Sequence, residues 1–261
     1  MRVATISQPR YLPYLGYFHR LAFSQVFVIL DTVQFKGREW DRRNKIRVHG
    51  AKDWTWLTVP VLRAPRETII SEIRIDNSQN WQEQHWRTLE GSYKRAPYFD
   101  RYAPDLSDFY RHRYDSIRDL NTEMILYFCD CLGISPKIVL ASTLEANGAS
   151  TDLLVRLCQA VQADIYWSGG DGRRYIDEEK FARVGISLSY QDYNHPAYSQ
   201  IHGHPFVPYM GIADLLFNCG PASLEVLLNG NSGPASPSYP ILPQLSRTPA
   251  AQAFPGHETV S

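Results

Sequence analysis

The sequence predicts one α/β domain built on a mostly parallel sheet, and three observations lead to this prediction. Short apolar runs alternate along the chain with stretches of helical periodicity. The first apolar run is followed by a loop, a helix and a second apolar run, which together form a βαβ unit of about thirty residues. The chain has 261 residues and is 44% hydrophobic, so it is long enough to bury a sizeable core.

The positions of prolines and the spacing of apolar residues predict the N-terminal unit. Residues 3–7 form a short apolar strand, and two prolines in residues 8–13 exclude regular structure from the loop that follows. Apolar residues at helical spacing predict a helix over 15–23. The continuous apolar run at 26–30 is typical of a strand buried on both faces, as in a parallel sheet.

The middle of the chain changes character. Residues 54–61 alternate as a strand does, and residues 69–75 alternate more weakly. From about 79 to 132 the pattern is helical, and prolines at positions 97 and 104 are expected to interrupt it. We therefore predict a helical insertion at about 79–132.

The α/β pattern resumes after the insertion and continues nearly to the end. Its predicted elements are strands at 137–141, 164–167 and 186–190 and helices at 151–162, 177–184 and 212–228. Residues 1–230 are thus predicted to form one Rossmann-like α/β domain. Residues 231–261 hold six of the 17 prolines and five serines with almost no charge, which predicts a disordered tail or a strap that orders against a neighbour.

Composition excludes several classes of protein. The 27 Lys and Arg residues balance 27 Asp and Glu residues, and this argues against general nucleic-acid binding. No apolar run is long enough to span a bilayer, and the N-terminus lacks the apolar core of a secretory signal. Four cysteines are too few for a disulfide scaffold, and their spacing suggests no zinc site. We expect a cytoplasmic protein with no membrane partner; its oligomeric state stays open.

The loop after the first strand is the first candidate site. In open α/β sheets, ligands bind beyond the carboxyl ends of the strands. The side chains placed at that edge are Gln8, Arg10, Tyr11, Tyr14 and Tyr17. They are candidates for substrate binding; the alternative is a proline-shaped connector whose tyrosines only pack.

The same position carries two histidines around a glycine in nucleotidyltransferases of the HIGH type. Here residues 14–17 keep the glycine but replace both histidines, and His19 is offset by two residues. The architecture is compatible with that superfamily, whereas its phosphate chemistry is not supported.

A second candidate follows the second strand, in residues 31–47. Asp31 and Gln34 are expected beside the first loop. Arg42, Arg43 and Asn44 are expected to hold a phosphate or carboxylate of a donor, because arginine binds such groups through two parallel hydrogen bonds. The alternative is a solvated ribbon in which the charges pair with one another.

Two later segments complete the set. The glycine-rich stretch 166–175 offers backbone N–H groups to an anion or forms only a tight turn; its candidate residues are Ser168, Gly169, Gly170 and Tyr175. Further on, Tyr198 and Gln200 are candidates for substrate binding, and His195 or Asp214 for a general base. Histidines 195, 202 and 204 do not follow a standard metal pattern, so no metal is predicted; surface histidines are the alternative.

Seven segments together resemble the WbqC-like protein family. They are QPRYLPYLGYF (8–18), VFVILDTVQF (26–35), WDRRNKI (40–46), YKRAPYF (93–99), YWSGG (166–170), YSQ (198–200) and IADLLFNCG (212–220). The resemblance covers roughly residues 3–229, the first motif is the most specific, and Thr32 and Gly211 are atypical. It implies a cytoplasmic transferase of surface-polysaccharide or natural-product clusters, which acylates or aminoacylates an amino sugar or another amine.

The resulting hypothesis is a transferase with a polar, tyrosine-lined cleft for a small-molecule substrate. Its donor is phosphorylated or delivered on a carrier or a tRNA, and the sequence requires no cofactor. The catalytic candidates are His195, Asp214 and Asp31. One alternative is a HIGH-like nucleotidyltransferase or ATP-dependent ligase without the usual histidines. Another is a non-catalytic protein that binds and presents the donor.

Overall fold

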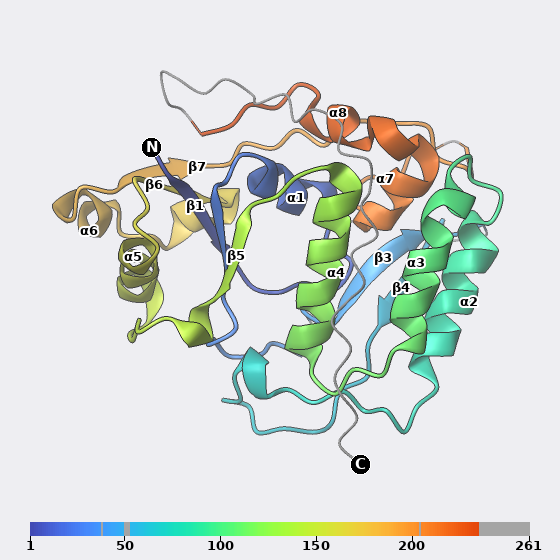
Figure 1. The fold of residues 1–261 in the computed structure, drawn as a ribbon, viewed down its shortest axis with the longest axis horizontal. Helices are drawn as coiled ribbons and strands as arrows, with labels where there is room; N and C mark the ends of the chain where they lie inside the picture. Colours follow the sequence, from blue (N-terminus) through green and yellow to red (C-terminus); the bar gives the residue numbers. More distant parts are fainter. Residues whose placement is uncertain (38, 50–52, 204, 235–261) are drawn as a thin grey trace, which may run out of the picture.

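A parallel sheet of five strands forms one half of the molecule (Figure 1). The structure is a computed structural model, and it describes residues 1–37, 39–49, 53–203 and 205–234. The strands lie in the order β5-β2-β1-β6-β7 and every neighbouring pair is parallel. They are β1 (Val3–Ser7), β2 (Val26–Ile29), β5 (Lys137–Leu140), β6 (Ile165–Ser168) and β7 (Ser187–Tyr190). This confirms the predicted fold class.

Helices cover both faces of the sheet because its central strands are apolar on both sides. On β2, Phe27 and Ile29 face the core that contains α1 (Leu15–Ala22), while Val26 and Val28 face α5 (Ser150–Ala160) and α6 (Glu178–Arg183). Successive side chains of a strand point to opposite faces, so one apolar run supplies two cores.

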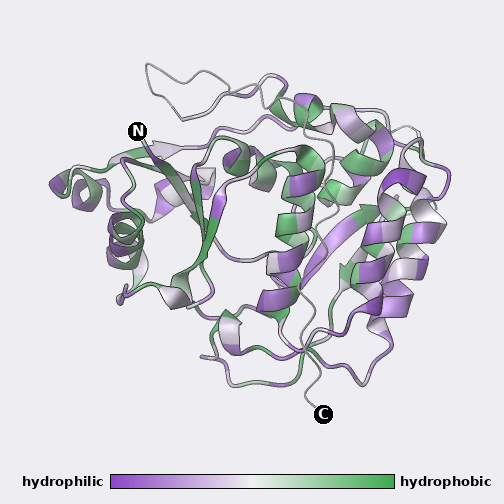
Figure 2. Ribbon diagram, in the orientation of Figure 1, coloured by the Kyte–Doolittle hydropathy of each residue, from purple (hydrophilic) through white to green (hydrophobic). Residues whose placement is uncertain are grey.

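The chain between β2 and β5 builds the other half of the molecule. It contains an antiparallel hairpin of β3 (Arg43–Arg47) and β4 (Trp54–Thr58), followed by three helices. These helices are α2 (Trp81–Tyr93), α3 (Phe99–Arg111) and α4 (Ile117–Leu132). In Figure 2, apolar residues gather on the sheet, whereas the outward turns of α2 are polar. The helices of the insertion are therefore amphipathic and share the larger core with α1.

Two predictions in this half are wrong. The segment 69–75 is not a strand but contains a 3₁₀ turn, Ile70–Glu72, because its backbone N–H groups bond to the loop after β2. Ile70 and Ile73, three residues apart, are both buried. Pro104 does not interrupt the helical pattern but lies inside α3, where its ring is exposed and only one helical hydrogen bond is lost.

The last predicted helix is broken into two pieces. They are α7 (Ile212–Cys219) and α8 (Ser223–Leu228), separated by a 3₁₀ turn that begins at Gly220. Gly220 has φ +53°, and the Tyr98 ring occupies the space that a side chain would need there. The predicted tail begins at 231, but residues 231–234 pack back on the body, where Asn231 exchanges hydrogen bonds with the Asn194 backbone. The rest of that tail, 235–261, lies outside the described residues.

Candidate functional site

The sheet has a topological switch point between β1 and β6. The strand order runs from β1 to β2 and β5 on one side and to β6 and β7 on the other. At this point the loops after neighbouring strands leave in opposite directions, and ligands of open α/β folds bind in the crevice between them. The loops that follow β1 and β6 therefore define the candidate site.

A buried arginine without an acidic partner lies at this edge. Arg20, in the last turn of α1, is 6% exposed. Its Nη1 donates to Oε1 of Gln191 at 2.7 Å and its Nη2 to Oγ of Ser7 at 3.4 Å, and its Nε has no hydrogen-bond partner in the described parts of the chain. Across the described residues, no carboxylate lies within 4.0 Å of its guanidinium. Buried guanidinium groups are normally paired, so this one offers free hydrogen-bonding capacity to an anion.

A second arginine lies close enough for its charge to affect Arg20. Burial lowers the pKa of Arg20, and the like charge of Arg10 lowers it further. Arg10 follows β1, and its Nε is buried without a partner among the described residues. Both arginines also act on the same two tyrosines. Burial raises the pKa of Tyr17 and of Tyr175, and the charges of Arg10 and Arg20 lower it.

The two tyrosines occupy different depths. Tyr17 is fully buried and its hydroxyl donates to the backbone oxygen of Gln8 at 3.0 Å. Tyr175 is 61% exposed. The charges of the arginine pair thus act on one buried and one exposed phenol, and Tyr17 also contacts the Gln8 backbone.

Glycine and glutamine give this site its room and its shape. A Cβ at Gly169 would lie 3.3 Å from Nη1 of Arg20, and one at Gly170 would lie 3.1 Å from the backbone oxygen of Gln191. The Gln191 amide also donates to the Gly16 backbone oxygen and contacts Nδ1 of His19, both at 2.8 Å. Gln191 at the end of β7 therefore fixes α1 and the Arg20 side chain together. Ser168 is buried, and its hydroxyl donates to the Gly169 backbone oxygen at 3.2 Å.

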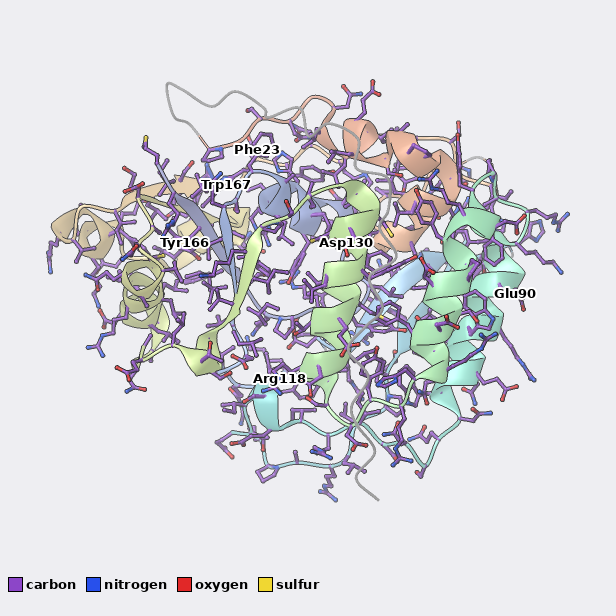
Figure 3. The ribbon with its side chains drawn as sticks, in the orientation of Figure 1. Phe23, Glu90, Arg118, Asp130, Tyr166 and Trp167 are labelled. Carbon is purple, nitrogen blue, oxygen red and sulfur yellow. The ribbon has the colours of Figure 1, made fainter. Side chains whose placement is uncertain are left out.

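Asp31 has a set of partners of its own. It is fully buried after β2 and accepts hydrogen bonds from the backbone N–H and the hydroxyl of Ser142, at 2.9 and 2.6 Å. Arg118 lies 3.8 Å away, at the foot of α4 in Figure 3. Both Asp31 oxygens are therefore engaged in joining β2 to the segment after β5. Gln34 is exposed and donates to the backbone oxygen of Arg66.

The candidates from the end of the chain form a separate cluster around Asp214. This carboxylate is fully buried and accepts hydrogen bonds from Tyr93 at 2.8 Å, Tyr198 at 2.7 Å and Gln200 at 2.9 Å. Burial raises the pKa of Asp214, and these three donors lower it. The structure brings Asp214, Tyr198 and Gln200 together, with Tyr93 as a member that the sequence did not suggest.

His195 packs beside that cluster, with its ring 6.5 Å from the Tyr198 ring. Its Nδ1 bonds to the Pro196 backbone oxygen at 2.9 Å, and its Nε2 accepts from the Tyr209 backbone N–H at 3.2 Å. Burial lowers the pKa of His195, which keeps the ring neutral. Both ring nitrogens are occupied, so a role as general base would require one of these contacts to open.

Tyr11 and Asn44 support the loop after β1 from behind. The Tyr11 hydroxyl is buried between His85 Nδ1 at 2.8 Å and the Tyr110 hydroxyl at 2.6 Å. The Asn44 amide donates to the backbone oxygens of Tyr11 and Leu12, and Leu12 has φ +44°. This pairing holds an unfavourable backbone turn in place.

The tyrosines do not line one open surface. Tyr11 and Tyr17 are fully buried, and the half-buried Tyr14 packs its ring 6.5 Å from Tyr193 and 6.2 Å from Tyr209. Arg42 and Arg43, which were predicted to act together with Asn44, make contacts different from those of Asn44, which is buried. Arg42 donates to the Gly37 backbone oxygen, whereas Arg43 lies over the Trp56 ring at 4.4 Å.

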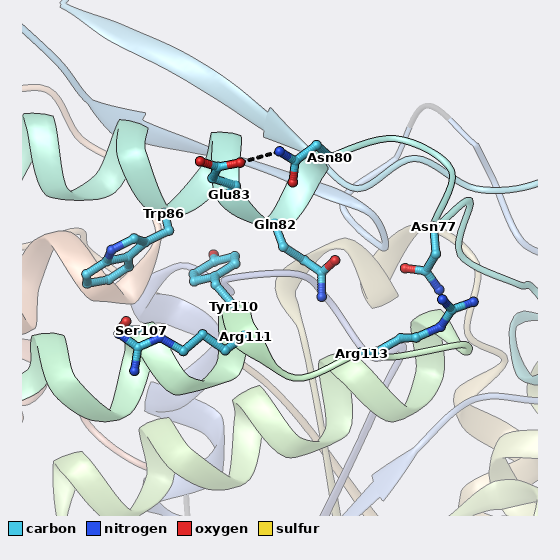
Figure 4. A pocket seen from close by; sticks show the side chains of 9 residues that line it. All are labelled: Asn77, Asn80, Gln82, Glu83, Trp86, Ser107, Tyr110, Arg111 and Arg113. Carbon is cyan, nitrogen blue, oxygen red and sulfur yellow. Dashed lines mark hydrogen bonds between the residues drawn. The ribbon is translucent and has the colours of Figure 1, made fainter.

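A shallow hollow of about 370 Å³ lies elsewhere, between α2 and α3 (Figure 4). Its walls include Trp86, Arg111 and Tyr110. The Tyr110 hydroxyl is the one that is hydrogen-bonded to the Tyr11 hydroxyl. Its walls include none of the buried side-chain atoms that lack a partner among the described residues. The sheet edge therefore remains the candidate site. Each helix in the described parts of the chain is too short or too polar to cross a membrane.

The strand order defines a Rossmann-like α/β protein with a topological switch point, and the buried Arg20 lies at this edge. The model of the WbqC-like protein family matches residues 8–226, and the chain belongs to this family, as its motifs predicted. It is 34% identical over 230 residues to Uncharacterized protein Rv1507c of Mycobacterium tuberculosis (strain ATCC 25618 / H37Rv), covering 87% of this chain and 98% of that protein. No solved structure matches the chain.

Proposed function

We propose that this protein is a transferase that moves an acyl or aminoacyl group to the amine of a small polar metabolite. Arg20 carries the proposal, because it is a buried cation at the ligand-binding edge of the sheet without a carboxylate within 4.0 Å among the described residues. Arg10 and Arg20 bind the phosphate or carboxylate of the donor through charge-assisted hydrogen bonds, which are stronger than neutral ones. Tyr175 closes over the bound anion from the exposed side.

The proposed reaction is an acyl transfer without net oxidation or reduction. The amine nitrogen attacks the acyl carbonyl carbon, the new C–N bond forms, and the bond from that carbon to the donor's oxygen or sulfur breaks. One proton leaves the nitrogen and one proton joins the leaving group, so the reaction needs no further reactant. Holding donor and acceptor in one site supplies much of the acceleration for such a step.

Polysaccharide or natural-product biosynthesis in the cytoplasm is the proposed setting. The support for it is membership of the WbqC-like family. An amino sugar or another biosynthetic amine is then the acceptor, and the donor is an activated ester or thioester, with the acyl group on a phosphorylated small molecule, a carrier or a tRNA.

The test is a reaction screen with the full chain. Acyl-coenzyme A, acyl phosphate and aminoacyl-tRNA donors are combined with amino sugars and simple amines, and amide products are detected by mass spectrometry. We expect one donor class to yield an amide, with at least a tenfold loss in Arg20→Met. Arg183→Met is the matched control, because Arg183 is an exposed arginine paired with Glu179 at 2.9 Å.

Three outcomes contradict the proposal. Equal rates for wild type and Arg20→Met would remove the arginine pair from the site. Pyrophosphate release from ATP without amide formation would favour the nucleotidyltransferase alternative. Tight binding of a tRNA or carrier without turnover would favour a protein that only presents the donor.

A further inference from the structure

Three buried hydrogen-bond acceptors near Arg10 have no donor among the described residues. Asp41 is 1% exposed and neither of its carboxylate oxygens has a partner among the described residues. Asn121, on α4, is fully buried and its side-chain oxygen also has none. An unsatisfied buried polar atom costs about 1–3 kcal/mol, and more when it is charged. Asp41 and Asn121 are in contact through the Asp41 backbone, so within the described residues three such acceptors lie in neighbouring side chains and are available to a ligand.

The orientation of Asn121 is determined by its surroundings. Its amide nitrogen donates to the backbone oxygens of Pro9 at 3.0 Å and Asp41 at 2.6 Å. Reversing the amide would bring its oxygen against two carbonyl oxygens, so the nitrogen must face them and the oxygen must point away. The same two contacts tie α4 to Asp41 and to the residue before Arg10.

Asp41 belongs to the same electrostatic neighbourhood as the arginine pair. The charges of Arg10, Arg20 and Asp41 all act on the buried Tyr17 hydroxyl. No contact of 4.0 Å or less joins Asp41 to Arg10, so the two opposite charges lie near each other without pairing. The Lys36 backbone lies near enough to the carboxylate to lower the pKa of Asp41, although neither carboxylate oxygen has a hydrogen-bond partner within 3.5 Å among the described residues. Within the described residues the two charges are not paired with each other, so each can bind a different group of a substrate.

We propose that Asp41 and Asn121 bind the primary amino group of the acceptor, next to the donor anion held by Arg10 and Arg20. This assignment rests on the proposed acyl transfer and names the position of its nucleophile. A primary ammonium offers three N–H donors, which match three acceptor oxygens. A calcium or magnesium ion would require about six oxygen ligands, and the neighbouring Arg10 charge would repel it.

Asp41 is also suited to accept the proton that the reaction releases. Burial raises the pKa of Asp41 to about 6, and the Arg10 charge limits the rise. A carboxylate with such a pKa is ionised at neutral pH and still accepts a proton more readily than an ordinary aspartate. The Asp41 carboxylate first takes one proton from the ammonium, which frees the nitrogen lone pair to attack the carbonyl carbon. As the C–N bond forms and the bond to the leaving oxygen or sulfur breaks, a second proton of the nitrogen passes to the leaving group, and the proton on Asp41 is released to solvent.

The test separates the amine site from the anion site with two probes. Methylammonium chloride and inorganic phosphate are titrated separately into the full chain, and NMR follows the Asp41 carboxyl carbon and the Asn121 side-chain amide. We expect methylammonium to shift both signals in the wild type and tetramethylammonium, which has no N–H donor, to shift neither. Asp41→Asn should bind methylammonium at least tenfold more weakly and keep phosphate binding, while Arg20→Met should do the reverse.

Each failure has its own signature. If methylammonium leaves both wild-type signals unchanged, the acceptors hold only water and the amine site is wrong, even where phosphate binding and the transfer reaction persist. Equal methylammonium affinity in wild type and Asp41→Asn would overturn it too. If phosphate binding is absent while methylammonium binds, the proposed donor site fails and the amine site stands. The wild-type titration decides the question even where a variant does not fold.

Discussion

Two buried aspartates of this protein have opposite surroundings. Asp214 accepts three side-chain hydrogen bonds, from Tyr93, Tyr198 and Gln200, at 2.7–2.9 Å. Asp41 is as deeply buried but has no hydrogen-bond partner on either oxygen among the described residues. Burial raises the pKa of both carboxyls. A satisfied network therefore holds structure together, whereas an unsatisfied group at a sheet edge is available to a ligand.

Two buried arginines repeat the contrast. Arg47, in the region of Asp214, pairs with Asp53 at 3.0 Å and donates to the backbone oxygens of Asp53 and Pro205. Arg20, at the switch point, has a glutamine and a serine for partners but no carboxylate within 4.0 Å in the described parts of the chain. Nε of Arg47 lacks a partner among the described residues, as Nε of Arg20 does, so the two arginines differ in their acidic partner: Arg47 has a carboxylate, and Arg20 has none within 4.0 Å in the described chain.

Removing the Asp214 carboxylate should have the largest effect on stability. In Asp214→Ala, two tyrosine hydroxyls and an amide lose their acceptor inside the protein, and we expect a loss of about 4 kcal/mol. Urea unfolding measures it. Asp171→Ala, at a side chain 92% exposed, is the control and should change stability by less than about 0.5 kcal/mol. A loss below about 1 kcal/mol in Asp214→Ala would mean that the network is not structural.

Asp41→Asn should stabilise the protein in a pH-dependent way. The folded pKa of Asp41, about 6, lies above the ordinary value of 3.8, so the folded state binds the proton more tightly. Its ionisation penalty is absent below pH 4 and complete above pH 6. The stability difference between Asp41→Asn and wild type should thus grow by about 3 kcal/mol in total, most of it between pH 4 and pH 7.

Unfolding curves at several pH values check this difference. Burial lowers the pKa of His19 and His85 to about 4. The folded state therefore loses stability as the pH falls below 6.5, because these two rings resist protonation in the folded state. Both are present in wild type and variant and cancel in the comparison. A flat difference curve would show that Asp41 is not an unsatisfied buried acid.

The parallel strands were predictable because burial on both faces leaves a continuous apolar run in the sequence. Strand β3 was not predicted, because Arg43, Lys45 and Arg47 look like a solvated charge run. Their place in a strand depends on the partner: Lys45 pairs with Trp56 and lies over the Trp54 ring at 4.4 Å. Only the register with β4 shows that the charges of Arg43 and Lys45 rest on indoles, whereas Arg47 pairs with Asp53.

The candidate site was predictable in part for a similar reason. The loops after β1 and β6 could be located from their prolines and glycines alone, and they hold Arg10 and Gly169. Arg20 and Asp41 were missed as site residues because their significance is the absence of a partner among the described residues, which is a property of the folded chain. One signal was available in the sequence for Arg20, since an arginine so close to the apolar positions of a short helix is unusual.

Arg20→Met should show a smaller effect on stability than on binding. The cation has no carboxylate to leave behind among the described residues, so we expect the stability to stay within about 1 kcal/mol of wild type. Loss of charge-assisted hydrogen bonds worth about 1.5–3 kcal/mol should weaken phosphate binding by at least tenfold. Calorimetric titration with phosphate measures the affinity. A destabilisation as large as that of Asp214→Ala would place Arg20 with the structural groups instead.

Removing the charge of Lys45 should have the smallest effect on stability. It also tests whether a cation without an acidic partner is special to the sheet edge, because the partners of Lys45 are indole rings. Its Nζ lies over Trp54 at 4.4 Å and Trp56 at 5.4 Å. Lys45→Met keeps most of the apolar stem and removes the charge, and we expect a loss of about 0.5–1 kcal/mol, the range of an exposed cation–π contact. A double-mutant cycle with Trp54→Leu isolates this energy. If the Lys45–Trp54 interaction energy is near zero, Lys45 has no effective partner either. An unpaired cation would then no longer distinguish the sheet edge from the rest of this fold.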